Sequence, residues 1–178
     1  MSNLSGTWNV DPVHSTLSLV VRHAMVTKVR DTFNEWSSDI TIDGENPAAS
    51  KATATVKVDS VDTRNADRDK HLASDDFFDT ANYPEASFTS SAFNVDEHGN
   101  GTVAGDLTIK GVTKPITLNV ETFGPEEAPS GETRLGFEAT TKIDRTEFGI
   151  DFNAPMNSGG VLLSKDITLE IEGSAVKA

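Results

Sequence analysis

Short runs of alternating apolar and polar residues, separated by Gly, Asn, Asp and Pro, follow one another along most of the chain. Successive side chains of a β-strand point to opposite faces, so each run predicts a strand with one apolar face. Between two of these runs, residues 24–31 predict a loop or a short helix. The predicted strands cover about residues 6–11, 15–23, 33–43, 52–58, 86–95, 103–109, 116–120, 134–143 and 161–173.

Eight or nine strands with short connections predict an all-β, antiparallel fold. Because every strand has one apolar face, the sheet either closes into a barrel or forms a two-sheet sandwich. An eight-stranded barrel is either filled by side chains or holds one small ligand. Small inward residues beside Trp36, Phe88 and Phe137 favour a lumen that is not completely filled. These small residues are Ala52, Ala54, Gly105, Ala139 and Thr141.

The alternation stops between Asp62 and Phe88. Arg64, Arg68 and His71 are spaced by four and three residues in this segment, so in a helix they would share one face. The segment is therefore either a surface crossover at one end of the barrel or a lid over a cavity.

A second short helix is predicted within the same segment. Ser74 is followed by two aspartates, a pattern typical of an N-cap with acidic first-turn residues. The aromatic pair Phe77 and Phe78 would plug the barrel, and Pro84 returns the chain to an extended conformation.

Composition narrows the possible partners. The chain has 178 residues, which fits one domain spanning residues 1–178. Its net charge of −13 argues against nucleic-acid binding and against charge-driven docking on anionic membranes. No apolar run is long enough to span a membrane. The N-terminus lacks the features of a secretory signal, so we expect a cytoplasmic protein, or a periplasmic or secreted one if a signal was trimmed.

The chain carries no motif for a known catalytic site. It has no cysteine, no nucleophile elbow, no phosphate-binding loop and no zinc-binding helix motif. His14 and His23 flank a strand on opposite faces, and they suit hydrogen bonds to loop backbones better than a joint metal site with His71. We therefore predict no catalytic residues, no metal and no cofactor.

Four segments in this order and spacing are informative together: WNVDPVHSTLSLVVRHAMVTKVRDTF, DTRNADRDKHLASDDFFDTANYPEASF, GDLTIKGVTKPITLNV and TKIDRTEFGI. They resemble the YceI-like family of bacterial proteins over essentially the whole chain. The resemblance implies an extended, lipocalin-like barrel of eight antiparallel strands, closed by one or two short helices. It also implies an elongated cavity for a polyisoprenoid, an isoprenoid quinone or a similar lipid, and a possible homodimer.

A prenyl chain needs a long apolar wall and a few polar groups at one mouth. For the polar head, Arg64, Arg68 and His71 are the best group, although salt bridges on a solvated face also explain them. The second group is Arg22, Lys28 and Arg30. The predicted wall consists of Leu19, Val21, Phe33, Trp36, Val56, Phe78, Phe88, Leu107, Leu118 and Phe137.

Near the C-terminal strand, Asp144 and Arg145 predict a turn, and Phe148 and Phe152 predict plugs of the barrel. We expect sequestration or transport of the ligand, gated by residues 62–88. Two alternatives stay open. One is an enzyme of the same fold that uses His23, His71 and Arg64; the other is a stress-associated protein with a packed barrel and a surface partner.

Overall fold

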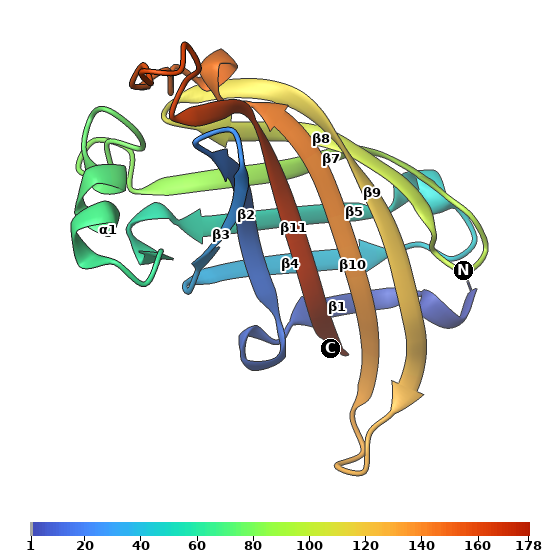
Figure 1. Ribbon diagram of the computed structural model, residues 1–178. Coiled ribbons are helices and arrows are strands. Elements are labelled where there is room, and N and C mark those ends of the chain that lie inside the picture. Colours follow the sequence, from blue (N-terminus) through green and yellow to red (C-terminus); the bar gives the residue numbers. More distant parts are fainter. Residues whose placement is uncertain (1) are drawn as a thin grey trace.

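A computed structural model describes residues 2–178 (Figure 1). In this range eight strands form a closed antiparallel barrel, in which neighbours are paired in the order given and the last strand also pairs with the first. These strands are β1 (Gly6–Val10), β4 (Trp36–Ile42), β5 (Lys51–Lys57), β7 (Glu85–Val95), β8 (Gly101–Ile109), β9 (Val112–Glu127), β10 (Thr133–Asp144) and β11 (Leu163–Lys177). The all-β barrel predicted from the alternation is confirmed.

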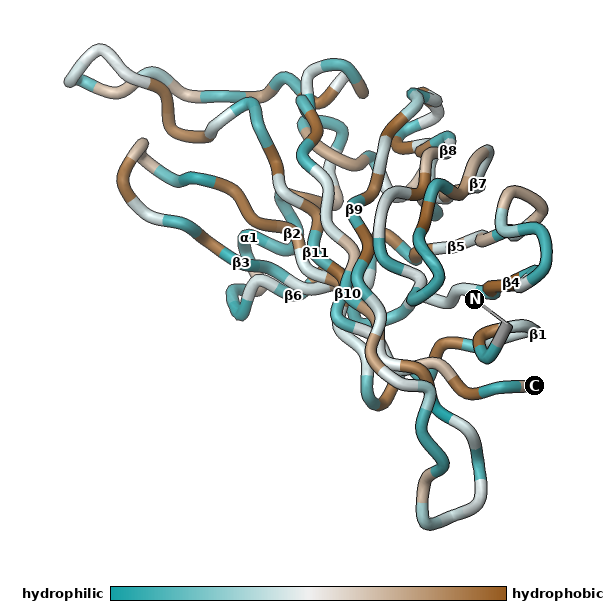
Figure 2. Tube along the Cα trace, turned by 90° about the vertical axis from the view of Figure 1, so that its right-hand side faces the viewer, coloured by the Kyte–Doolittle hydropathy of each residue, from teal (hydrophilic) through white to brown (hydrophobic). Residues whose placement is uncertain are grey.

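Three further strands extend the sheet from β11: β2 (Thr16–His23), β3 (Thr27–Phe33) and β6 (Val61–Asp62). The C-terminal end of β11 pairs with β1, whereas its N-terminal part pairs with β2. As a result, β2 and β3 lie with α1 on one side of the molecule, and β1 and β4 lie on the other (Figure 2). Side chains of β2 and β3 on one side and Trp36 of β4 on the other line a cavity.

Strand β3 corrects the prediction of a loop or helix over residues 24–31. Its inward positions are Val29, Asp31 and Phe33, so a buried carboxylate interrupts the apolar alternation. β6 pairs with β3 only at Thr32 and Phe33. The outer edge of residues 27–31 therefore has no partner strand in the described structure.

The segment from Asp62 to Phe88 also differs in detail from the prediction. The helix α1 (Ala66–Ala73) begins after Asn65, whose side chain accepts hydrogen bonds from Asp67 N and Arg68 N. Ser74 is the C-cap of this helix rather than the N-cap of another, and consecutive turns follow it. Short 3-10 helices occupy Ser2–Leu4, Pro12–His14, Pro47–Ala49, Val58–Ser60 and Arg145–Phe148.

The barrel interior divides into two regions. At the β1 end a cluster of buried side chains surrounds Trp8, which is fully buried and donates from Nε1 to Leu4 O at 2.7 Å. Phe137 belongs to this packed cluster, and its ring lies over Gly173, where a Cβ atom would stand 2.3 Å from the ring. The larger cluster, around Leu17 and Phe148, surrounds the cavity at the other end.

Candidate ligand-binding cavity

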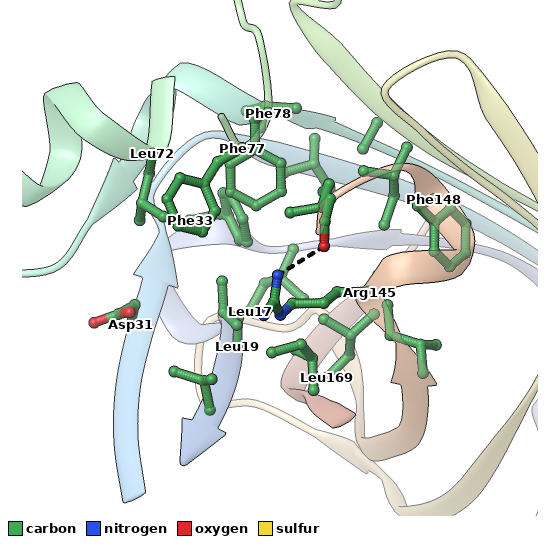
Figure 3. A pocket seen from close by; sticks show the side chains of 18 of the residues that line it. Leu17, Leu19, Asp31, Phe33, Leu72, Phe77, Phe78, Arg145, Phe148 and Leu169 are labelled. Atoms are coloured by element: carbon green, nitrogen blue, oxygen red, sulfur yellow. Dashed lines mark hydrogen bonds between the residues drawn. The ribbon is translucent and has the colours of Figure 1, made fainter. Parts of the chain in front are cut away.

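A cavity of about 450 Å³ occupies the forked half of the barrel (Figure 3). Its walls come from 33 residues on the barrel strands, on β2 and β3, on α1 and the turns that follow it, on Val58–Ser60 and on the segment between β10 and β11. Only six of the lining side chains are polar or charged: His23, Asp31, Arg68, His71, Ser87 and Arg145. The volume falls in the range of small-molecule sites in proteins.

Nine of the ten predicted wall residues line this cavity. The exception is Phe137, which is buried as its strand position predicts but lies in the packed cluster around Trp8. Alternation specifies which face of a strand a side chain occupies, and it does not specify how far along the barrel the cavity extends. Contact between these nine residues and a ligand stays a prediction.

Residues between β10 and β11 contribute more of the wall than the sequence indicated. Phe148 and Phe152, predicted as plugs, both line the cavity, together with Ile150, Leu162 and Leu163. This segment has no regular alternation, so periodicity gave no signal there.

An aromatic contact joins the segment from Asp62 to Phe88 to the segment after β10. The His71 ring lies edge-on to Phe77 and to Phe152, with centroid distances of 5.0 Å and 4.9 Å, and Phe77 lies 5.1 Å from Phe152. A hydrogen bond of 2.8 Å between His71 Nε2 and Asp76 Oδ2 holds the imidazole in place. All three rings line the cavity, so this contact closes one part of its wall.

Arg145 is a buried cation in this wall, rather than only part of a turn. It is 5% exposed, and its guanidinium donates from Nε to Ser164 O at 2.9 Å and from Nη1 to Ile150 O at 2.7 Å (Figure 3). Within the described chain Nη2 has no hydrogen-bond partner, and no carboxylate pairs with the side chain. Burial lowers the pKa of Arg145, while Asp144 and Asp151 act in the opposite direction.

Asp31 is the second buried charged group of the wall. It is 6% exposed and has no hydrogen bond or ion pair among the described residues. Burial raises the pKa of the Asp31 carboxyl, and the positive charge of Arg68 partly offsets this effect. A carboxyl group without a partner in an apolar wall is a candidate contact for a polar ligand group.

We expect Asp31→Asn to be more stable than the wild type at neutral pH. Because burial raises the folded-state pKa, the native state loses stability as pH rises through that pKa and Asp31 ionises. Removing the charge restores this stability, and because the carboxyl oxygens reach the cavity rather than being fully enclosed, we expect a gain of about 1 kcal/mol. Urea unfolding across the pH range measures the difference.

This gain should vanish below about pH 4, where the carboxyl is protonated in both the folded and the unfolded state. Asp39→Asn, at an exposed position of β4, controls for the general effect of removing one negative charge from an acidic chain. An equal gain in both variants, or a gain independent of pH, would contradict the assignment.

The predicted polar residues separate into two groups. Arg68 and His71 line the cavity and are exposed to solvent, which places the mouth beside α1. Arg64 does not line the cavity. It lies before the N-cap residue Asn65, outside α1, and adopts a left-handed conformation with φ 59°, so it does not share a helical face with Arg68 and His71. The second predicted group is also outside: Arg30, for example, pairs with Glu170.

The histidines do not converge. His23 lines the cavity, whereas His14 is bonded to Asp11 at 2.7 Å. Among residues 2–178, no three His, Asp or Glu side chains lie close enough together to hold a metal ion. In the same range, no helix has the length and apolar character needed to cross a membrane.

Residues 8–175 match the YceI-like domain family. The chain belongs to this family. The YceI protein of Escherichia coli O17:K52:H18 is 39% identical over 160 residues, which cover 90% of this chain and 81% of that protein. The crystal structure of the Campylobacter jejuni YceI protein is 34% identical, with a TM-score of 0.75, and the match covers 88% of this YceI-like chain and 90% of the other.

A further solved structure shares the fold of this YceI-like protein. It is a polyisoprenoid binding domain from Saccharophagus degradans that is implicated in plant cell wall breakdown. Its TM-score is 0.69, and the match covers 96% of this chain and 98% of that one. At 17% identity the likeness shows a common architecture.

Proposed function

We propose that this YceI-like protein binds one long apolar molecule in its forked barrel and sequesters or carries it. The observation that carries the proposal is the cavity of about 450 Å³ with an almost entirely apolar wall. Each methylene group transferred from water to such a wall contributes about 0.8 kcal/mol. A chain of a few isoprene units therefore gains enough to bind at roughly micromolar concentration after the cost of association.

The ligand class we propose is an isoprenoid chain with an oxygen-bearing head, such as a polyprenol or an isoprenoid quinone. The polyisoprenoid binding domain of Saccharophagus degradans has the same fold and supports an isoprenoid ligand. Within this chain, the polar groups of the wall support an oxygen-bearing head over a plain hydrocarbon.

The proposed contacts for the head are Asp31 and Arg68 at the mouth. Asp31 presents a carboxyl group without a partner, and Arg68 is close enough to influence its pKa without forming an ion pair. A hydroxyl group between them can donate to the carboxylate and accept from the guanidinium. Arg145, whose Nη2 has no partner in the described structure, offers a donor to a carbonyl or hydroxyl oxygen elsewhere on the wall.

We propose that access is gated where the segment from Asp62 to Phe88 meets the segment after β10. Phe152 on one side meets the His71 ring edge-on and the Phe77 ring at a tilted angle on the other side. Aromatic pairs of this kind contribute about 0.5–1.5 kcal/mol each beyond the burial of their area. Separation of these rings therefore opens the wall at modest cost and leaves the barrel strands paired.

Fluorescence titration tests the binding proposal, because Trp36 lines the cavity and Trp8 is buried in the packed cluster. We expect a short-chain isoprenoid quinone to quench tryptophan emission saturably, at about micromolar concentration. The variant Trp36→Phe, which retains only Trp8, should lose most of the signal. A prenol should displace the quinone at about a tenfold lower concentration than a hydrocarbon of the same chain length. This difference in affinity corresponds to one good hydrogen bond from the prenol hydroxyl.

The absence of saturable quenching, or the same quenching in Trp36→Phe, would contradict occupation of this cavity. Equal displacement by prenol and hydrocarbon would remove the proposed head contacts and leave the apolar site in place.

A further inference from the structure

The three longest stretches of this acidic chain without an acidic residue are residues 12–30, 107–120 and 152–165. Asp and Glu make up 28 of the 178 residues, and none of them occurs in these stretches. These stretches lie far apart in the sequence. The distribution of charge is therefore strongly uneven along the chain.

The fold places parts of the first and the third of these stretches, residues 12–30 and 152–165, side by side. The turn between β2 and β3 is bonded to the segment before β11 by Ala24 N to Leu162 O at 2.7 Å, and His23 stands opposite Leu163. Arg22 N also donates to Ser164 Oγ at 3.1 Å. Figure 1 shows the blue turn and the orange-red segment together at one end of the molecule.

Large apolar side chains project from this end into solvent. Met25 is 57% exposed, Val26 is 75% exposed and Val161 is 42% exposed. We call these three residues the apolar tip. Ala24 and Met25 adopt left-handed φ values of 49° and 62°, a conformation that Gly or Asn adopts more easily. The turn therefore presents an exposed apolar side chain at a position where local conformation alone would favour glycine.

Basic side chains flank the apolar tip. Arg22, Lys28 and Lys165 are exposed, and in the described structure none of them forms an ion pair with a carboxylate. The acidic residues near these cations have partners of their own. Asp166 lies 3.9 Å from Lys142, and Glu170 pairs with Arg30. Asp144, whose pKa Lys165 helps to lower, accepts hydrogen bonds from Thr146. This end of the molecule therefore carries local positive charge around an apolar centre, although the chain as a whole is acidic.

The same end adjoins the cavity. His23 and Val29, which flank the turn, line the cavity, as do Leu162 and Leu163 next to Val161. The residues of the apolar tip are therefore neighbours in sequence of residues that line the cavity, so a bilayer in contact with the tip would lie close to the cavity.

We propose that this end docks on a bilayer that contains anionic lipid, with the apolar tip inserted among the acyl chains. Arg22, Lys28 and Lys165 would contact the lipid phosphates, since basic residues close to an anionic surface are attracted to it. The net charge of −13 argues against docking by the overall charge of the chain, but charges more than about 10 Å away are largely screened at physiological salt, so the local charge of this end decides the interaction. Docking would bring the cavity close to the bilayer, in which an isoprenoid lipid is dissolved.

Co-sedimentation of the full chain with vesicles tests the proposal. We expect binding to vesicles of phosphatidylcholine with phosphatidylglycerol, weak binding to phosphatidylcholine alone, and a decline with added salt. Val26→Asp should weaken binding by about tenfold, because it places a charge where the acyl chains begin. The pair Lys28→Glu and Lys165→Glu should weaken it by a similar factor.

Val13→Asp is the matched control, because Val13 is 83% exposed and lies in Pro12–His14, at the opposite end of β2. It should bind vesicles as the wild type does. No binding of the wild type to anionic vesicles, or equal loss in Val13→Asp and Val26→Asp, would overturn the proposal. Quenching of Trp36 by a ligand added in detergent should be unchanged in Val26→Asp, so docking and cavity occupation are tested separately.

Discussion

Ala54→Trp is expected to block uptake of an isoprenoid ligand while the barrel stays folded. Ala54 lies on β5 opposite Phe88, and its side chain lines the cavity. An indole ring at this position would fill space that the ligand chain needs. If it displaces three methylene groups at about 0.8 kcal/mol each, the affinity falls by about fiftyfold. Isothermal titration calorimetry with a short-chain isoprenoid quinone measures this affinity without depending on tryptophan emission, which the added indole ring would alter.

The control is Thr53→Trp, because Thr53 is the preceding residue of the same strand and faces outward. It introduces the same side chain without narrowing the cavity, so its affinity should match that of the wild type. Wild-type affinity in Ala54→Trp would place the ligand elsewhere. Thermal unfolding of both variants distinguishes a filled cavity from a damaged fold.

Trp8→Ala is expected to reduce the free energy of unfolding by about 3–5 kcal/mol, as loss of a large buried aromatic side chain does. Trp8 is fully buried, donates a hydrogen bond to Leu4 O and lies beneath Lys177 Nζ, 5.5 Å from the ring centroid. It sits on β1, which closes the barrel by pairing with β4 and β11. The loss is a large part of the total stability of a typical domain, which is about 5–15 kcal/mol.

Trp36→Ala is the matched substitution at the other tryptophan. Trp36 is only partly buried and faces the cavity, so fewer of its atoms lose close-packed neighbours. We expect a smaller loss of stability than in Trp8→Ala, together with weaker ligand binding. Urea unfolding of the two variants compares them directly, and equal losses would contradict the division into a packed end and a hollow end.

The alternation of apolar and polar residues was sufficient to predict the barrel, because burial of one face imposes a period of two. The alternation did not predict strand β3, in which a charged residue that is a candidate ligand contact occupies an inward position. Asp31 interrupts the pattern of β3, so that strand was missed, and the same carboxyl group became a proposed contact for the ligand head. Arg145 was likewise predicted as part of a turn, because nothing local shows that its guanidinium points into a cavity.

The sequence also did not indicate how far along the barrel each inward side chain lies, in the packed end or at the cavity. Phe137 and Leu107 are both inward residues of long strands, yet one packs against Gly173 and the other lines the cavity. Whether an inward residue is packed or lines the cavity depends on which side chains from other strands lie at the same level of the barrel. The net charge of the chain likewise did not predict the local charge of its surface. Two stretches without acidic residues, residues 12–30 and 152–165, meet at one end only in the folded structure.

Native mass spectrometry of the protein purified from its own host, followed by organic extraction, tests the central claim most directly. We predict a complex of protein with one isoprenoid or similar long-chain molecule, released as a single lipid class on extraction. The Ala54→Trp variant purified in the same way should carry much less of it. A mass equal to that of the chain alone, with no uptake of added quinone or polyprenol, would contradict the proposal that the cavity holds a lipid.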